Sequence, residues 1–246
     1  MRFDVLTIFP EMFAPILGES IIGRAQQKGI IEINTIDIRD FTKNKHRKVD
    51  DYPYGGGSGL VMMAQPIYDA YMSILNSVDT KPWVIYMSPQ GNTFNQKAAE
   101  RLKMHNHIVI LCGHYEGVDE RVLEEIVDEE ISIGDFVVTG GEVPAMLLID
   151  CVSRLIPGVL SGESSYVNES HYNGILEYPQ YTRPYEFNGR KVPEILLSGH
   201  HANIEKWRYQ QSLKRTYEKR PDLFEKLELS DSDKALLEEA LREESK

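Results

Sequence analysis

Residues 107–117 read HIVILCGHYEG, a short apolar run from His107 to Cys112 that ends in a loop with glycines at 113 and 117. A short apolar run bounded by turn residues is typical of a strand that is buried on both faces of a parallel sheet. The same arrangement occurs earlier, where Trp83–Met87 is followed by Ser-Pro-Gln-Gly. These two stretches predict neighbouring central strands, each ending in a turn-rich loop.

Outward from these strands, the chain alternates between strand and helix patterns. Phe3–Phe9 and Ile31–Ile38 are strand-like, and Ile131–Ile133 is a weaker candidate. Helical periodicity fits five stretches: Ile21–Lys28, Pro66–Ser77, Asn95–Lys103, Glu120–Ile126 and Val143–Leu155. The last is apolar on most sides, which predicts deep burial. Strands alternating with helices predict an α/β fold with a mainly parallel sheet.

The remainder of the chain has a different pattern. Pro157–Pro184 shows no sustained period, and a stretch of this length without structure is usually functional or a linker. After it we expect only helices: His200–Arg220, a short helix from Pro221, and a last helix for which Ser230 is the N-cap. The predicted domains are an α/β domain at 1–160, a linker at 161–174 and a small all-helical domain at 175–246.

Length and composition exclude several classes of protein. With 246 residues, 41% hydrophobic and 26% charged, the chain has the composition of a folded globular protein. No run approaches the ~18 consecutive apolar residues of a membrane helix, and the N-terminus does not have the pattern of a secretory signal. Cys112 and Cys151 each stand alone, so neither a disulfide framework nor a zinc site is predicted. We therefore expect a cytoplasmic protein without a membrane partner.

The net charge is −11, from 27 basic and 38 acidic residues, which by itself argues against a nucleic-acid binder. Two local patches are basic, however. Five basic residues and one acid fall in 39–48, and six basic residues and two acids fall in 199–220. Either patch could hold a phosphate backbone, or both could be solvated helix faces.

Three strand ends carry loops of small or turn-forming residues: Tyr86–Gly91, Cys112–Gly117 and Ile133–Glu142. In an open parallel sheet, ligands bind beyond the carboxyl ends of the strands. Glycine lets the backbone approach a ligand closely, so three such loops predict a pocket that suits a flat heterocycle such as adenine. Each loop alone could equally be a tight turn.

Other motifs narrow the chemistry. The sequence has no G-x-G-x-x-G after the first strand, no P-loop, no H-E-x-x-H and no G-x-S-x-G. Residues 50–59, DDYPYGGGSG, directly follow the first basic patch. Their tyrosine rings, beside Lys and Arg, suit an unstacked RNA base, although a flexible surface loop has the same composition.

Several long motifs together carry a family resemblance. They are Asp50–Gly59 with Val61-Met62, Gly113–Arg121 (GHYEGVDER), Ser132–Pro144 (SIGDFVVTGGEVP), Leu155–Leu160 (LIPGVL), Tyr178–Pro184 (YPQYTRP), Val192–His200 (VPEILLSGH) and Lys206-Trp207-Arg208. In these motifs the chain resembles the bacterial tRNA (guanine-N1)-methyltransferases, which are knotted, SPOUT-type enzymes. The resemblance extends over almost the whole chain.

The resemblance implies properties that composition and spacing do not show. It implies a deep trefoil knot formed by the three loops, and a homodimer that shares its active sites. It also implies methylation of the tRNA guanine 3′ of the anticodon (position 37), with S-adenosylmethionine as methyl donor. Mg²⁺ is implied by the resemblance alone. The donor site would comprise Tyr86, Ser88, Pro89, Gly113, Ile133, Gly134, Asp135, Phe136, Val137, Val138, Gly140, Gly141 and Pro144.

The resemblance also assigns the reaction to particular residues. N1 of neutral guanine carries a proton that a base must remove, and a donor at O6 would stabilise the developing charge. The matching positions are Glu169 for the base, where the family has Asp, and Arg154 for the donor. Contacts with RNA are expected from Tyr54, Gly55, Tyr115, Glu116 and Arg183. Ser58 and Leu60 stand where the family usually has Pro and Met.

The sequence leaves two other hypotheses about function open. One is an RNA-binding protein that retains the donor pocket but has lost catalysis, and its support is the change from Asp to Glu at 169. The other is a nucleotide-dependent oxidoreductase, although the sequence lacks the G-x-G-x-x-G motif that such enzymes have after the first strand. No histidine is assigned a catalytic role.

Overall fold

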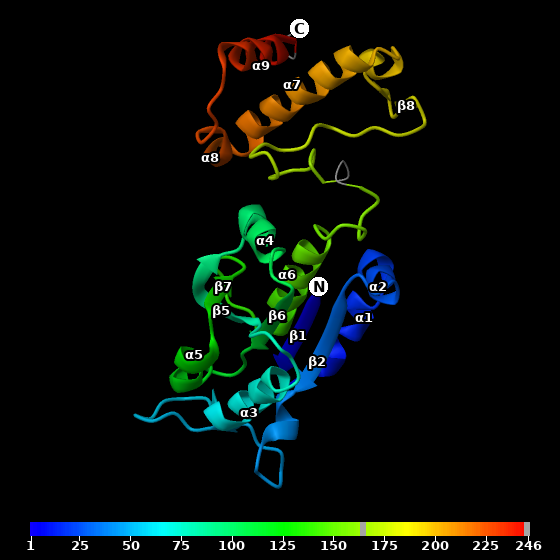
Figure 1. The fold of residues 1–246 in the computed structure, drawn as a ribbon. Coiled ribbons are helices and arrows are strands. Elements are labelled where there is room, and N and C mark those ends of the chain that lie inside the picture. Colours follow the sequence, from blue (N-terminus) through cyan, green and yellow to red (C-terminus); the bar gives the residue numbers. More distant parts are fainter. Residues whose placement is uncertain (163–165, 244–246) are drawn as a thin grey trace. The chain divides into compact units, whose positions relative to one another are not determined.

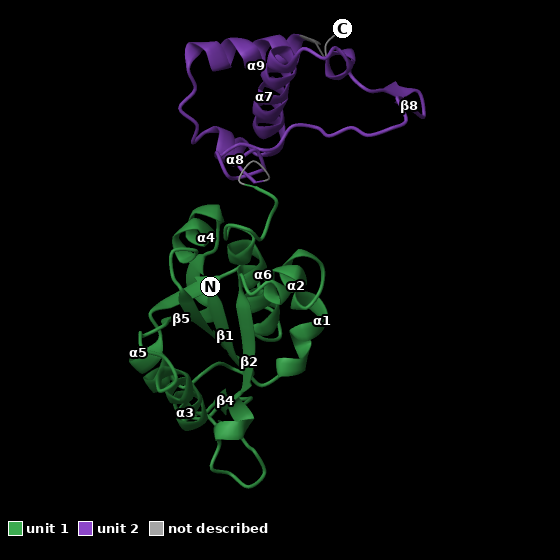
Figure 2. Ribbon diagram, turned by 45° about the vertical axis from the view of Figure 1, so that its right-hand side comes forward, with its two compact units in different colours: residues 1–163 green, residues 164–246 purple. Residues whose placement is uncertain are grey.

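The computed structural model describes residues 1–162 and 166–243 (Figures 1 and 2). The chain divides into two compact units, residues 1–163 and 164–246, which we call unit 1 and unit 2. Residues 163–165 of the predicted linker and residues 244–246 of the predicted helical domain lie outside the described residues. The separate linker at 161–174 stays a prediction.

Unit 1 contains a five-stranded sheet in the order β2-β1-β6-β5-β7, and every neighbouring pair is parallel, as predicted. Its strands are β1 (Arg2–Thr7), β2 (Glu32–Asp37), β5 (Trp83–Thr93), β6 (His107–Cys112) and β7 (Glu129–Ser132). Strand β6 has the predicted bounds, and its residues from Ile108 to Cys112 are fully buried. The parallel α/β fold is therefore confirmed.

Helices cover the two faces of this sheet (Figure 1). They are α1 (Ala14–Leu17), α2 (Ser20–Gln27), α3 (Ala64–Leu75), α4 (Gln96–Leu102), α5 (Glu120–Ile126) and α6 (Glu142–Ser153), with 3-10 turns η1 (Pro10–Met12) and η2 (Ile38–Phe41). Alternate strand residues, such as Val84, Tyr86, Val109 and Leu111, pack in one cluster with apolar residues of α3 and α5. Helix α6 packs against β1 and β6, with α1 and α4 beside it.

A short antiparallel pair, β3 (Asp50–Asp51) and β4 (Val61–Met62), encloses the glycine-rich segment. Its second strand is tied to the loop after β6, because the Met62 N–H donates to the Gly117 carbonyl at 2.9 Å and the Glu116 N–H donates to the Leu60 carbonyl at 2.9 Å. The glycine-rich segment is thus anchored beside one of the three predicted pocket loops.

Unit 2 is built on α7 (His201–Lys219), which contacts α8 (Pro221–Phe224) and α9 (Asp231–Glu243). Ser230 caps α9 as predicted: its Oγ accepts the Asp233 N–H at 3.2 Å and donates to the Asp233 carboxylate at 2.7 Å. Among the described residues, no helix combines the length and apolarity that crossing a membrane requires.

The expectation of helices alone after Pro184 is wrong. A hairpin of β8 (Glu186–Phe187) and β9 (Arg190–Lys191) projects from unit 2, followed by the 3-10 turn η4 (Glu194–Leu197) (Figure 2). Its turn is Asn188-Gly189, with φ of 51° and 77°. Asn-Gly is the strongest short-range hairpin signal because both turn positions need a positive φ.

Candidate active site

A cavity of about 440 Å³ lies at the carboxyl ends of β6 and β7 and beside residues 86–90 of β5, next to the start of α6. We call it the strand-end cavity. Eleven of the thirteen residues predicted to bind the methyl donor line it, and the two that do not are Gly134 and Asp135. Two residues predicted to contact RNA, Tyr115 and Glu116, also line it. The three predicted loops therefore meet around one space.

The first wall of the cavity comes from β5, which continues beyond its predicted end at Met87 as far as Thr93. Met87 and Asn92 both pair with Ile131, so Ser88–Gly91 forms a bulge within the strand instead of a terminal loop. Burial and the nearby carboxylates of Glu130 and Glu120 raise the pKa of Tyr86 to about 12. The Tyr86 phenol in this wall is therefore protonated at neutral pH.

The loops Cys112–Gly117 and Ile133–Glu142 form the second and third walls, and glycines let them lie close together. The Gly141 N–H donates to the Gly113 carbonyl at 3.0 Å. A Cβ at Gly141 would stand 2.7 Å from Cys112 Cα, and a Cβ at Gly113 would stand 2.8 Å from the Tyr86 hydroxyl. Neither position has room for a side chain, so these glycines allow the loops to pack against each other as well as against a ligand.

A buried polar network joins these loops to the first strand. Glu142, 1% exposed in the first turn of α6, accepts a hydrogen bond from Thr7 Oγ1 at 2.6 Å, and its Oε2 lies 2.6 Å from His114 Nε2. The Phe9 N–H donates to Thr7 Oγ1 at 2.9 Å, and the Phe9 ring meets the His114 ring edge-on with 4.9 Å between centroids. The network thus fixes the loop that contains Gly113, His114 and Tyr115.

Sequence reasoning missed Glu142 and left His114 without a role. The available signal was a carboxylate at the start of a helix that is otherwise apolar on most sides. A buried carboxylate needs hydrogen-bonding partners, so this position predicts a buried polar contact even though the partners cannot be named from the sequence.

The charged residues that line the strand-end cavity are acidic. Glu116, Glu120 and Glu130 line it, and no Lys or Arg is among the described residues of its lining. The side chain of Glu116 packs beside Gly59, where a Cβ would collide with it. A ligand in this cavity therefore meets a negative potential, which favours groups with positive charge.

The other predicted residues lie elsewhere. Tyr54 is fully exposed and, with Arg121, lines a neighbouring hollow of about 1000 Å³. Arg154 is the half-buried C-cap residue of α6 in unit 1. Glu169 is half-buried in unit 2, where it lines a cavity of about 630 Å³, and Arg183 lines a different unit 2 cavity. The two predicted catalytic residues thus belong to different units.

No group of three or more His, Cys, Asp or Glu within residues 1–162 and 166–243 stands close enough together to hold a metal ion. These residues do not by themselves provide the Mg²⁺ site that the resemblance implies.

The fold and the strand-end cavity define an α/β protein whose candidate ligand-binding site lies where ligands bind to open parallel sheets. The profile of the family described as tRNA (Guanine-1)-methyltransferase TrmD matches residues 1–226. The chain therefore belongs to this family, and its activity is the methylation of guanine N1 in tRNA.

Relatives named tRNA (guanine-N(1)-)-methyltransferase are similar over nearly their whole length. The protein of Ruminiclostridium cellulolyticum is 67% identical over 92% of this chain and 97% of its own. That of Lachnospira eligens is 56% identical over 95% and 99%. That of Halalkalibacterium halodurans is 50% identical over all of both chains.

Proposed function

We propose that the chain transfers a methyl group from S-adenosylmethionine to N1 of the guanine 3′ of the anticodon, position 37. The strand-end cavity is the observation that carries this proposal. Eleven residues that the resemblance assigns to the donor line it, and its charged groups are carboxylates. S-adenosylmethionine presents a flat adenine together with a sulfonium and an ammonium, and such a ligand matches a cavity with apolar lining residues and carboxylates.

When bound, S-adenosylmethionine supplies a methyl group on a sulfur that is an activated leaving group, so no covalent intermediate with the protein is required. The residues of the chain bind and orient the two substrates. Gly113 and Gly141 let the loops of the cavity pack closely, and the buried Glu142 network holds these loops in place. Fixed loops of this kind keep the reacting atoms in a near-attack geometry, which supplies much of the rate enhancement.

Glu169 is the proposed base that removes the proton from guanine N1, and Arg154 is the proposed donor to O6. Their support is that Arg154 matches the family motif and that Glu169, where the family has Asp, retains the carboxylate. The Glu169 N–H donates to the Tyr166 carbonyl at 3.1 Å, and the Tyr172 N–H donates to the Glu169 carbonyl at 3.4 Å. These local turns fix the backbone of Glu169, so the additional methylene relative to Asp has to be accommodated by the side chain and by the position of the guanine.

The homodimer and the deep trefoil knot are further parts of the proposal. Helices α1 and α6 are in contact and expose apolar side chains, with Ile16 60% exposed, Val143 54% and Leu147 42%. Exposed apolar residues gathered on neighbouring elements are typical of a protein interface. The close packing of Gly141 on Cys112 supports a knot formed by the loops around the strand-end cavity.

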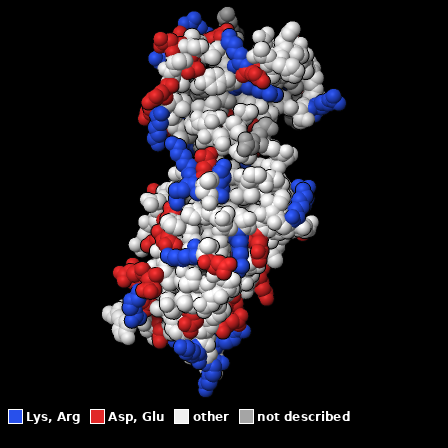
Figure 3. All heavy atoms as spheres, in the orientation of Figure 1, with Lys and Arg blue, Asp and Glu red and all other residues white. Residues whose placement is uncertain are grey.

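The proposed RNA contacts of unit 1 are Tyr54, Gly55, Tyr115 and Glu116. Their support is the exposure of Tyr54 and the hydrogen bond from Glu116 to Leu60, which ties the glycine-rich segment to the strand-end cavity. Lys and Arg side chains gather at the end of unit 1, where Figure 1 places the loop after η2 (Figure 3). In unit 2, Arg183 is the proposed contact, on the resemblance.

The test is methyl transfer from labelled S-adenosylmethionine to two unmodified tRNA transcripts, one with guanine and one with adenine 3′ of the anticodon. Wild type is compared with Glu169→Gln, Glu169→Asp and the exposed control Glu225→Gln, and donor binding is measured by calorimetry. We expect transfer to the guanine transcript alone. In Glu169→Gln the turnover should fall by about 100-fold or more, since general bases contribute about 10²–10⁴.

Donor affinity should be unchanged in Glu169→Gln, and Glu169→Asp should retain measurable turnover because it keeps the carboxylate. Near-normal turnover by Glu169→Gln would refute its role as the base. Equal transfer to both transcripts would refute the assigned position of the guanine.

A further inference from the structure

Unit 2 contains a cavity of about 550 Å³ between residues 178–185, η4 and α7, with the base of the β8–β9 hairpin at its edge. We call it the Arg208 cavity. Three tyrosines, Tyr178, Tyr181 and Tyr185, and two arginines, Arg183 and Arg208, line it. None of its described lining residues is acidic, although the whole chain carries a net charge of −11. The cavity therefore combines aromatic surface with local positive charge.

Arg208 is the central feature of this cavity. Its guanidinium carbon lies 4.9 Å from the centroid of the Tyr178 ring. Its Nε is buried and has no hydrogen-bond partner among the described residues. A buried donor without an acceptor costs free energy, and an anion that accepts from the guanidinium removes this cost. A guanidinium that lies over an aromatic ring loses less conformational freedom when it binds a phosphate.

The aromatic rings provide the second component. Tyr181 is 47% exposed, with its ring centroid 6.5 Å from that of Trp207, and Tyr185 is 44% exposed. Exposed aromatic faces beside cations bind unpaired bases by stacking, while the cations hold the phosphate. The second strand of the adjacent hairpin is basic, since β9 consists of Arg190 and Lys191.

We propose that the Arg208 cavity binds one unpaired nucleotide of the tRNA other than the guanine that is methylated, with its phosphate on Arg208 and its base on the tyrosines. This rests on the proposed function, because it takes tRNA as the substrate. The nucleotide contributes to the binding of the tRNA and takes no part in methyl transfer.

The test uses the full chain and an unmodified tRNA transcript. Arg208→Ala should raise both the Kd and the KM for tRNA by about tenfold or more, since stacking and phosphate contacts of one nucleotide have this magnitude. The matched control is Arg242→Ala, which removes an 80% exposed arginine from α9 of the same unit. It should change either constant by less than about threefold. The kcat at saturating tRNA and the KM for S-adenosylmethionine should stay at the wild-type values in both.

Two further variants separate the parts of the site. Arg208→Lys keeps the charge but loses the planar group, so its tRNA affinity should stay closer to that of Arg208→Ala than to wild type. Tyr185→Ala removes a side chain that is 44% exposed, and it should weaken binding of tRNA. The slope of log K against log salt concentration should fall by about one in Arg208→Ala and stay unchanged in Tyr185→Ala.

Equal effects of Arg208→Ala and Arg242→Ala on tRNA affinity would overturn the proposal. So would a loss of kcat at saturating tRNA without a change in KM, because it would place Arg208 in the chemical step. If wild type binds tRNA but shows no guanine-dependent transfer, the proposed function fails while the binding comparison still reports on the Arg208 cavity. The two failures are therefore distinguishable.

Discussion

Replacing Glu142 with Ala tests whether the buried network holds unit 1 together. The carboxylate is 1% exposed and bonds Thr7 Oγ1 and His114 Nε2, each at 2.6 Å. Glu142→Ala leaves the Thr7 hydroxyl and the His114 ring without their acceptor, and at about 1–3 kcal/mol for each the cost is about 2–6 kcal/mol. With a shift of roughly 2–4 °C per kcal/mol for a chain of this size, Tm should fall by roughly 4–24 °C. Glu142→Gln keeps the shape but weakens the bonds to neutral strength, so it should cost about 1–2 kcal/mol.

The assay is thermal and urea unfolding of wild type, Glu142→Ala, Glu142→Gln, His114→Ala and the double alanine variant. Since Glu142 and His114 share one bond, the double variant should lose less stability than the two single variants together, with a coupling of about 0.5–3 kcal/mol. The control is Glu124→Gln, an exposed carboxylate on α5 that should change stability by no more than about 0.5 kcal/mol.

Additive losses, or a loss for Glu142→Ala as small as that of the control, would refute the reasoning. The folded variants also report on the strand-end cavity, because His114 lies between Gly113 and Tyr115 in its wall. Below its Tm, Glu142→Gln should show a raised KM for S-adenosylmethionine with a smaller change in kcat. An unchanged KM would mean that the network stabilises the fold without positioning the loop.

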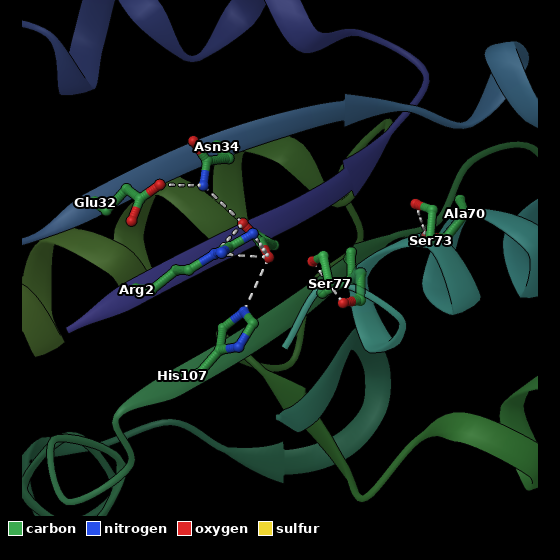
Figure 4. A network of polar contacts seen from close by, with 9 residues as sticks. Arg2, Glu32, Asn34, Ala70, Ser73, Ser77 and His107 are labelled. Carbon is green, nitrogen blue, oxygen red and sulfur yellow. Dashed lines mark hydrogen bonds and ion pairs between the residues drawn. The ribbon is translucent and has the colours of Figure 1, made fainter. Parts of the chain in front are cut away.

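Two further changes test the packing and the charge of unit 1. Gly141→Ala would place a Cβ 2.7 Å from Cys112 Cα, so the loops must separate; it should cost about 1–3 kcal/mol and raise the KM for the methyl donor. Gly189→Ala, where a Cβ meets nothing within 4 Å, controls for backbone strain alone, and an equal change in KM would contradict the steric argument. Asp4 is fully buried on β1, and its carboxylate bonds Arg2, Asn34 and His107, which Figure 4 labels. Burial alone would raise its pKa, but hydrogen bonds from His107, Arg2 and Asn34 outweigh burial and lower it. Because the folded pKa lies below the ordinary 3.8, the stabilisation is present above that pH and is lost as pH falls through the folded pKa. Urea unfolding at pH 5, 4 and 3 should therefore show a steeper loss in wild type than in Asp4→Asn, and equal slopes would refute it.

The sequence predicts elements best where local pattern and burial coincide. The bounds of β6 match the prediction because its apolar run begins and ends where burial does. Those of α5 also match, and the Asp119 side chain caps it by accepting the Arg121 N–H at 3.1 Å. β5 differs because Asn92 and Thr93 pair again with β7 after the bulge. Pairing depends on the partner strand, so the Ser-Pro-Gln-Gly pattern cannot predict it.

The location of the strand-end cavity follows from the sequence for a geometric reason. The carboxyl ends of parallel strands meet at one edge of a sheet, so three glycine-rich loops after such strands converge. Which residues of a loop face the cavity depends on the local turn. Gly134 does not line it; its N–H donates to Ser132 Oγ at 3.1 Å, and its carbonyl accepts from the same hydroxyl at 3.0 Å. That a residue belongs to one of these loops predicts that it lies near the cavity. Whether it faces the cavity depends on the backbone conformation of the loop.

The Glu142 network marks the limit of sequence reasoning most clearly. A carboxylate in the first turn of an apolar helix predicts a buried partner, because an unpaired buried charge is too costly to persist. The partners are 135 and 28 residues away along the chain, and they are brought together only because β1 and β6 are adjacent in the sheet while α6 packs on both. That adjacency is a property of the strand order, which local patterns do not encode. The glycines of these loops also allow close packing between loops. This role depends on the strand order as well, because the backbone beside each glycine belongs to a neighbouring loop. The sequence therefore indicates which loops form the walls of the strand-end cavity. The strand order decides which contacts hold these loops in place.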